Sequence, residues 1–209
     1  MRKLIFTALV WGISLVGFSQ EKAMTTEEKN AFTKEIVRTT KDIKTLSTDF
    51  VQYKNMSFMS KEIESKGQMQ LSVPNKLLWK YTSPFAYSIA FTDNKITIND
   101  QGKKNKIDIG NNKKFAKINT LIVGSISGNM FDEKEFTIGY FKNKNRRIAK
   151  LVPLSKEIAQ YISEIVLYFD EGQNTVSEVK LIEPSADYTR IVFTNKKVNT
   201  QLDEKAFTN

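Results

Sequence analysis

The stretch between residues 63 and 84 constrains the fold more than any other part of the chain. From Ile63 to Val73, uncharged side chains alternate with charged or amide-bearing ones. This alternation is typical of an antiparallel strand with one buried and one solvated face. Pro74 and Asn75 then favour a turn. A second strand places three large side chains on one face: Leu77, Trp79 and Tyr81. The pattern predicts a β-hairpin with one apolar face.

The beginning of the chain has the pattern of an export signal. A short basic segment, residues 1–3, precedes an apolar run from Leu4 to Phe18, and Ser19 offers a small residue for cleavage. A membrane anchor is the alternative, but the run is short for a span of about 20 apolar residues. We therefore expect residues 1–19 to be a cleaved signal peptide and residues 20–209 to form a single exported domain in the periplasm.

Cysteine and histidine are both absent from the 209 residues. Their absence excludes a Ser–His–Asp triad, a Cys–His pair, histidine or thiolate metal sites and disulfides. Glu62 and Glu64 share a strand face, so a two-carboxylate glycosidase remains formally open. Acidic residues at such positions usually belong to a solvated strand edge. We expect no enzyme activity, no catalytic residue, no metal and no cofactor.

The formal net charge of +9 favours anionic neighbours such as phospholipid head groups, acidic lipids or nucleic acid. A solvated, lysine-rich surface is the alternative explanation. The chain also has 14 Phe and 7 Tyr, and aromatic side chains beside lysines can stack nucleobases. These aromatic residues fall on strand faces that are predicted to be buried. We expect a monomer that binds no nucleic acid.

Two segments have the pattern of amphipathic helices. Thr25 and Glu28 form a capping-box sequence, which predicts a helix running from there to about Lys44. In the second segment, between Gly110 and Gly128, apolar residues recur at spacings of three and four. A glycine near the end of this segment predicts a loosely held helix.

The rest of the chain reads as short strands separated by turn sequences, about ten or eleven in all. A sheet of this size with one apolar face twists and curls. We therefore predict an α+β, mainly β fold: an unclosed antiparallel β-barrel whose trough is covered by a lid of two amphipathic helices. A plain α+β domain, in which the helices fill the trough and leave no cavity, fits the same pattern.

Several short motifs resemble the outer-membrane lipoprotein carrier (LolA-like) family. That family has a hydrophobe-Ser-x-x-Phe-x-Gln opening, a Lys/Glu-Gly pair, a Pro-Asn turn, a Trp-x-Tyr-x-x-Pro strand and a closing segment. The order and spacing of the motifs match over residues 36–207. The matching segments are Leu46–Gln52, Lys66–Gly67, Pro74–Tyr81, Pro84, Ile191–Phe193 and Asn199–Phe207.

The resemblance implies a carrier that binds lipoprotein acyl chains and takes them across the periplasm. An inner-membrane ABC transporter would load it, and an outer-membrane acceptor would receive the cargo.

In that family an arginine commonly precedes the Pro-Asn turn and ties the lid shut. Here Val73 has that position, and Thr40 is the helix residue aligned opposite it. This departure leaves open how the lid is held and whether the cargo is another amphiphile, such as a glycolipid or pigment lipid. A non-catalytic sensor that binds a lipid or a peptide is a further alternative.

Large side chains on the predicted inward faces are the candidate cavity residues. For each of them, ordinary core packing is the alternative role, because a one-residue slip in strand register inverts its face. The candidates are Phe50, Leu71, Trp79, Tyr81, Ile89, Phe91, Ile96, Ile98, Ile118, Leu121, Ile122, Ile165, Leu167, Ile191 and Phe193.

Overall fold

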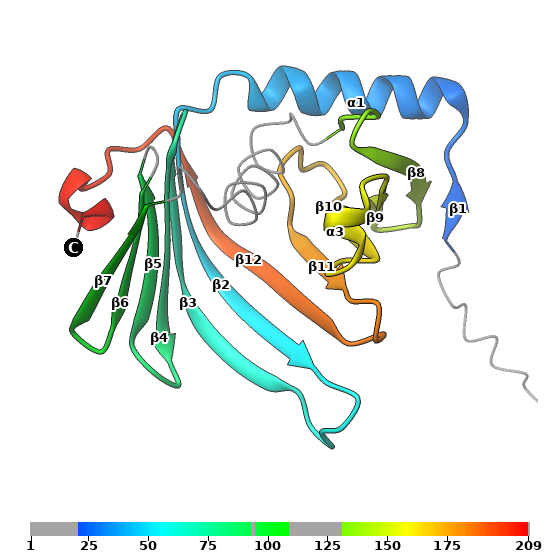
Figure 1. Ribbon diagram of the computed structural model, residues 1–209. Coiled ribbons are helices and arrows are strands. Elements are labelled where there is room, and N and C mark those ends of the chain that lie inside the picture. The colour runs from blue at the N-terminus through cyan, green and yellow to red at the C-terminus, as the bar shows by residue number, and fades with distance from the viewer. Residues whose placement is uncertain (1–20, 93–94, 109–130, 209) are drawn as a thin grey trace, which may run out of the picture.

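The computed structural model describes residues 21–92, 95–108 and 131–208. Within these ranges the chain forms one antiparallel sheet of twelve strands, in the order β1-β8-β9-β10-β11-β12-β2-β3-β4-β5-β6-β7 (Figure 1). The strands are β1 (Lys22–Ala23), β2 (Thr45–Asn55), β3 (Ile63–Ser72), β4 (Lys76–Ser83), β5 (Tyr87–Thr92), β6 (Lys95–Asp100), β7 (Lys103–Asp108), β8 (Phe136–Lys142), β9 (Arg146–Pro153), β10 (Glu164–Asp170), β11 (Glu178–Ile182) and β12 (Tyr188–Val198). The predicted open antiparallel sheet is confirmed. The sequence pattern does not predict the two-residue strand β1.

The predicted hairpin is confirmed as β3 and β4. Met69 pairs with Trp79 and Leu71 pairs with Leu77, so the apolar positions of the two strands face the same side. Each of these four side chains is at most 6% exposed. The hairpin forms because its alternation lets these apolar side chains be buried on one face while Lys66 and Lys80 stay exposed on the other.

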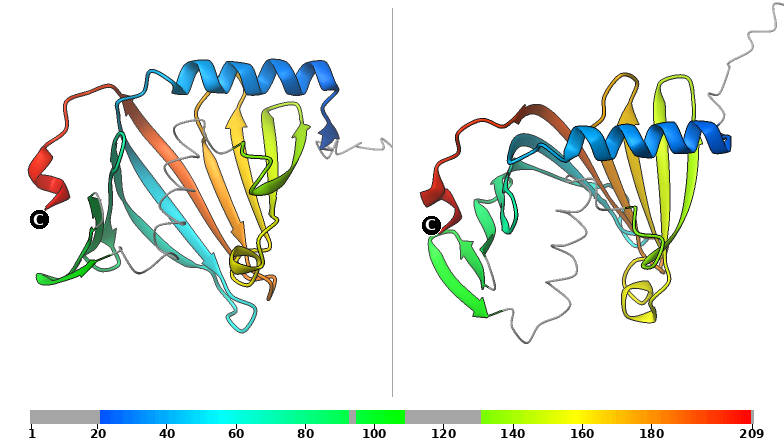
Figure 2. Two further views of the ribbon diagram at one scale, coloured as in Figure 1. Left: turned by 45° about the horizontal axis from the view of Figure 1, so that its top comes forward. Right: turned by 90° about the horizontal axis from the view of Figure 1, so that it is seen from above.

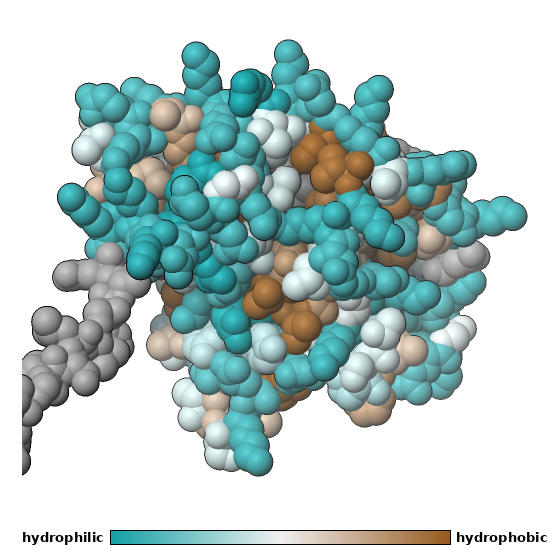
Figure 3. Space-filling model, turned by 180° about the vertical axis from the view of Figure 1, so that it is seen from behind, coloured by the Kyte–Doolittle hydropathy of each residue, from teal (hydrophilic) through white to brown (hydrophobic). Residues whose placement is uncertain are grey.

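The sheet curls, so that it has a concave and a convex face (Figure 2). The convex face, seen from behind in Figure 3, is mainly hydrophilic, and its hydrophobic side chains gather in small areas. An antiparallel sheet with this distribution keeps one face in water and buries the other. The apolar side chains that the alternation predicts are therefore concentrated on the concave face.

Helix α1 (Thr26–Thr40) begins at the predicted capping box. The Thr25 hydroxyl accepts from the Glu28 amide at 3.3 Å, and the Glu28 carboxylate accepts from the Thr25 amide at 3.1 Å. The helix ends at Thr40, earlier than the predicted Lys44, because the Lys44 amide already donates to Asn199 at the start of β2. The second predicted helix lies outside the described residues.

Helix α1 crosses one end of the curled sheet, over the half formed by β8 to β11 (Figures 1 and 2). Its buried residues Phe32 and Ile36 pack into a cluster with Tyr140, Leu151 and Phe169 from that half. A short helix, α3 (Lys156–Ala159), links β9 to β10. Among the described residues, no helix has both the length and the apolar character that crossing a membrane requires.

The C-terminal 3-10 helix η2 (Glu204–Phe207) covers the convex side of β4 and β5. Phe207, which is 1% exposed, packs there against Leu78 and Ala90. This contact explains why β5 has small residues on that face, since the phenyl ring needs the space. The closing segment of the chain is thus part of the fold.

Candidate functional site

The concave face is defined by residues that pair across neighbouring strands. Phe193 of β12 pairs with Phe50 of β2, and Leu167 of β10 reaches Ile191 of β12 through Val179. All candidate cavity residues that the structure describes lie on this face. They are Phe50, Leu71, Trp79, Tyr81, Ile89, Phe91, Ile96, Ile98, Ile165, Leu167, Ile191 and Phe193. Ile118, Leu121 and Ile122 lie outside the described residues.

These side chains divide between two apolar clusters. Ile165 and Leu167 belong to the cluster beneath α1. The other described candidates belong to a cluster in the half formed by β12 and β2 to β6. Phe193 packs against both clusters, so it stands at their boundary. The concave face is therefore a continuous apolar surface.

Aromatic rings form the floor of the second half. The Phe50 ring meets Trp79 at 4.8 Å and Tyr81 at 5.1 Å between centroids, both edge to face. Gly67 is required beneath them, because a Cβ there would lie 2.7 Å from the Phe50 ring. The Tyr81 hydroxyl donates to Gln52 at 3.0 Å, and burial raises the pKa of Tyr81. The tyrosine therefore stays neutral at physiological pH.

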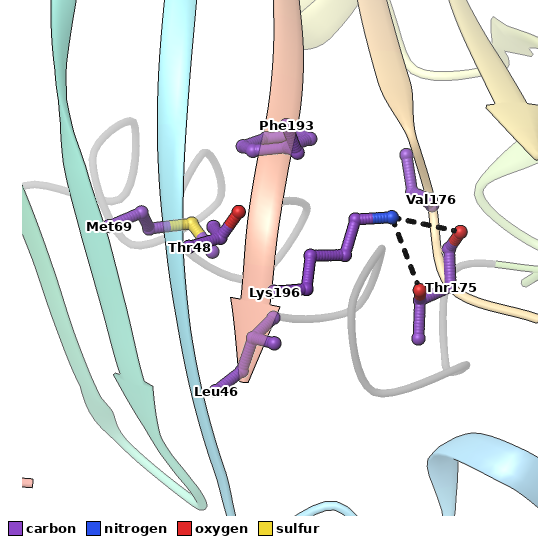
Figure 4. A pocket seen from close by; sticks show the side chains of 7 residues that line it. All are labelled: Leu46, Thr48, Met69, Thr175, Val176, Phe193 and Lys196. Atoms are coloured by element: carbon purple, nitrogen blue, oxygen red, sulfur yellow. Dashed lines mark hydrogen bonds between the residues drawn. The ribbon is translucent and has the colours of Figure 1, made fainter. Parts of the chain in front are cut away.

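A pocket opens between the two clusters, beside Phe193 (Figure 4). Its volume is about 10 Å³, room for about one water molecule. The lining residues are Leu46, Thr48, Met69, Thr175, Val176, Phe193 and Lys196. The sequence analysis predicted only Phe193 among them. Thr48 and Lys196 were missed because strand alternation selects apolar positions, and Lys196 reaches this face only through an irregularity in β12.

The two positions aligned with the family latch have other roles here. Val73 is 38% exposed, and its amide donates to the Lys44 carbonyl at 2.9 Å. Thr40 is buried, and its hydroxyl donates back to the Ile36 carbonyl at 2.8 Å, within α1. The side chain of Val73 is apolar, so it cannot supply the hydrogen bonds of an arginine.

Arg147 of β9 binds α1 instead. Its guanidinium donates to Glu35 of α1 at 2.8 Å and lies 5.0 Å from the centre of the Phe32 ring. The same group donates to the Gln173 carbonyl at 2.8 Å and to the Asn174 side chain at 3.0 Å. The hydrogen bond from Arg147 holds the pKa of Glu35 below its usual value.

Further polar contacts hold α1 to the same half of the sheet. Lys142 of β8 forms an ion pair with Glu28, and Lys29 forms one with Glu133 at 3.0 Å. Thr39 accepts a hydrogen bond from Asn174 at 3.1 Å. Together with Arg147, these contacts fasten α1 to β8, β9 and the β10–β11 loop.

Comparisons with known proteins agree with this architecture. Residues 41–209 match the family described as outer membrane lipoprotein carrier protein LolA. An outer-membrane lipoprotein carrier protein of Chromobacterium violaceum is 26% identical over 164 residues, which cover 78% of this chain and 76% of the relative.

Two solved structures are among those similar to this chain. The crystal structure of MucB has a TM-score of 0.52 and 11% identity, and the match covers 87% of this chain and 62% of that one. The LolA superfamily protein NE2245 from Nitrosomonas europaea has a TM-score of 0.45 and 7% identity, with 86% and 97% of the two chains covered. The family match spans most of the sequence, and the curled antiparallel sheet beneath a helix is the fold that it implies. The chain belongs to the outer membrane lipoprotein carrier protein LolA family.

Proposed function

We propose that this protein is a non-catalytic periplasmic carrier that binds the acyl chains of lipoproteins on its concave face. The observation that carries the proposal is the continuous apolar surface across ten neighbouring strands, β8 to β6 in sheet order. In this proposal the carrier is loaded by an inner-membrane ABC transporter and delivers its cargo to an outer-membrane acceptor. The family membership supports both steps.

Burial of methylene groups supplies the binding energy. Each buried CH₂ contributes about 0.8 kcal/mol, so ten of them contribute about 8 kcal/mol without any specific polar contact. The pocket beside Phe193 encloses only about 10 Å³, far less than the roughly 300–1,000 Å³ of typical ligand sites. Full acyl chains therefore require the sheet and its lid to part. A lid that opens at small energetic expense then allows release to the acceptor.

Another amphiphile is a second candidate cargo. Val73 favours it, because the arginine that commonly holds the lid in the lipoprotein carriers is replaced at this position by an apolar residue. A carrier whose lid is held by a different contact can differ from its relatives in the ligand that opens it.

Lipid extraction and native mass spectrometry on the protein purified from its native cells test the proposal. A bound lipoprotein, identified by its peptide, is the expected result, and another lipid at fixed stoichiometry would move the assignment to the second candidate. A fluorescent acyl probe provides the binding assay. Ile89→Glu, on the concave face of β5, should abolish probe uptake, whereas Ser88→Glu, on the opposite face of the same strand, should not. A ligand-free protein that takes up no probe would contradict the carrier function.

A further inference from the structure

A β-bulge in β12 turns one lysine onto the apolar concave face. Thr194 pairs with Asp49, and Lys197 pairs with Ser47. Between these two pairs, Asn195 and Lys196 of β12 stand opposite one residue of β2, Thr48. Asn195 adopts a positive φ of 53°, as the extra residue of a bulge often does. Without the bulge, strict alternation from Phe193 would place Asn195 on the concave face and Lys196 in solvent.

The bulge is fixed by neighbouring side chains. The Thr48 hydroxyl, which is buried on the concave face, donates to the Thr194 carbonyl at 2.7 Å. On the opposite face, the Asn195 side chain donates to Asp49 at 2.8 Å, and Asp49 also accepts from Gln68 at 3.0 Å. Because these contacts hold both sides of the bulge, the orientation of Lys196 is built into the sheet.

Lys196 lies in apolar surroundings. Figure 4 shows its side chain extending from β12 toward Thr175 and Val176, and it shares the lining of the pocket with Leu46, Met69 and Phe193. Burial lowers the pKa of the Lys196 ammonium. A lysine stem readily packs on apolar surface, but its charged end normally reaches water or an acidic partner.

The ammonium lacks an acidic hydrogen-bond partner within the described part of the chain. It donates to the Thr175 hydroxyl at 3.2 Å and to the Thr175 carbonyl at 3.4 Å, both uncharged oxygens. The acidic residue that acts on it electrostatically, Asp170, is hydrogen-bonded to Arg146 at 3.1 Å. Lys196 therefore offers, at the boundary between the two apolar clusters, a positive charge whose hydrogen-bond acceptors within the described residues are uncharged.

We infer that Lys196 is a specificity-determining residue that binds an anionic oxygen at the head of an acyl ligand. The inference rests on the proposed acyl-chain carrier function and favours its second candidate cargo, an acidic amphiphile in which a carboxylate or phosphate oxygen adjoins the acyl chain. The apolar walls bind the chain, and the ammonium pairs with the head. Charge complementarity favours an anion over a neutral ester, because an ion pair in an apolar pocket is stronger than a hydrogen bond to an uncharged carbonyl.

The test compares two probes that differ only in head-group charge: a fluorescent long-chain fatty acid and its methyl ester. The wild-type protein should bind the acid at least about tenfold more tightly, which is about 1.4 kcal/mol. Lys196→Met should remove this preference without weakening the binding of the methyl ester. Lys196→Arg should retain the preference for the acid. Lys197→Met is the matched control, since this neighbour faces the convex side and should leave the preference unchanged. Inorganic phosphate alone should not displace the fatty acid.

Each other outcome would overturn the inference. Equal binding of the two probes by the wild-type protein, or an acid preference that survives Lys196→Met, would mean that the lysine only supports the β10–β11 loop. Displacement by inorganic phosphate would mean that the site binds free anions. If neither probe binds the wild-type protein, both the carrier function and the inference are contradicted. If acid and ester bind equally well, the inference alone is contradicted.

Discussion

Replacement of Arg147 by methionine should loosen α1 without unfolding the sheet. The arginine side chain is 17% exposed and binds Glu35, the Gln173 carbonyl and Asn174 at once. Methionine keeps an apolar contact with the Phe32 ring, so the substitution removes chiefly the charge and its hydrogen bonds. The perturbation is therefore confined to the junction between α1, β9 and the β10–β11 loop.

The magnitude follows from the contacts that are lost. A hydrogen bond involving a charged group contributes about 1.5–3 kcal/mol, and the contact with the Phe32 ring adds about 0.5–1 kcal/mol. Two features reduce the sum: the Glu35 side chain is 40% exposed and can be hydrated, and the buried Nε of Arg147 has no hydrogen-bond partner among the residues that the structure describes. We expect the free energy that holds α1 against the sheet to fall by about 2 kcal/mol, which corresponds to a roughly 30-fold larger equilibrium constant for its opening.

Hydrogen exchange measured by mass spectrometry provides the assay, and Arg146→Met provides the control. Arg146 is the preceding residue of β9 and binds Asp170 and Glu178, away from α1. In Arg147→Met the amides of α1 should exchange faster while those of the sheet keep their rates, and Arg146→Met should leave α1 unchanged. Unchanged exchange of α1 in Arg147→Met would refute the idea that this arginine holds the helix.

The same contact has a defined pH dependence. The hydrogen bond from Arg147 lowers the pKa of Glu35 in the folded protein, so its contribution is present above the ordinary pKa of about 4.5. The contribution is lost as the pH falls through the lowered value. The difference in α1 exchange between the wild-type protein and Arg147→Met should therefore become smaller in acid, after correction for the intrinsic rates. A difference that keeps its full size in acid would contradict the role of the Glu35 carboxylate.

Three further substitutions test the packing of the fold, each measured by urea unfolding. Thr25→Ala removes the cap of α1 and should cost about 1 kcal/mol, and no loss would argue against the capping box with Glu28. Gly67→Ala would bring a Cβ within 2.2 Å of the Lys80 carbonyl, so we expect a loss of about 3 kcal/mol, and wild-type stability would contradict the close packing of β3 and β4. Phe207→Ala should cost about 3–5 kcal/mol if the C-terminal segment is part of the core, and a change below 1 kcal/mol would show that it is not.

Elements that depend on neighbouring residues could be predicted from the sequence. The hairpin follows from alternation and a Pro-Asn turn, and the start of α1 follows from the spacing of Thr25 and Glu28. The apolar run of β10 predicts a strand covered on both faces, and Ile165, Val166 and Leu167 are each at most 5% exposed. In these cases a short stretch of sequence contains the whole physical reason for its structure.

Features that depend on contacts between distant segments could not be predicted. Arg147 and Glu35 are 112 residues apart, and nothing in either local sequence indicates that they meet. The two-residue strand β1 is too short to show a periodicity. Strict alternation from Phe193, which lies on the concave face, assigns Lys196 to the solvated face. The bulge at Asn195 reverses this alternation and places Lys196 on the concave face.

The lid contacts and the proposed ligand contact meet in the β10–β11 loop. Asn174 accepts a hydrogen bond from Arg147 and donates one to Thr39 of α1, while the next residue, Thr175, accepts from Lys196. A ligand oxygen that binds the Lys196 ammonium competes with Thr175, and the loop that loses this contact is the one that fastens the helix. Because such coupling is reciprocal, a ligand that loosens α1 binds more tightly when α1 is already loose. Arg147→Met should then bind the fatty acid more tightly than the wild-type protein, and weaker binding would show that the lid contacts and the ligand contact stabilise the same closed state.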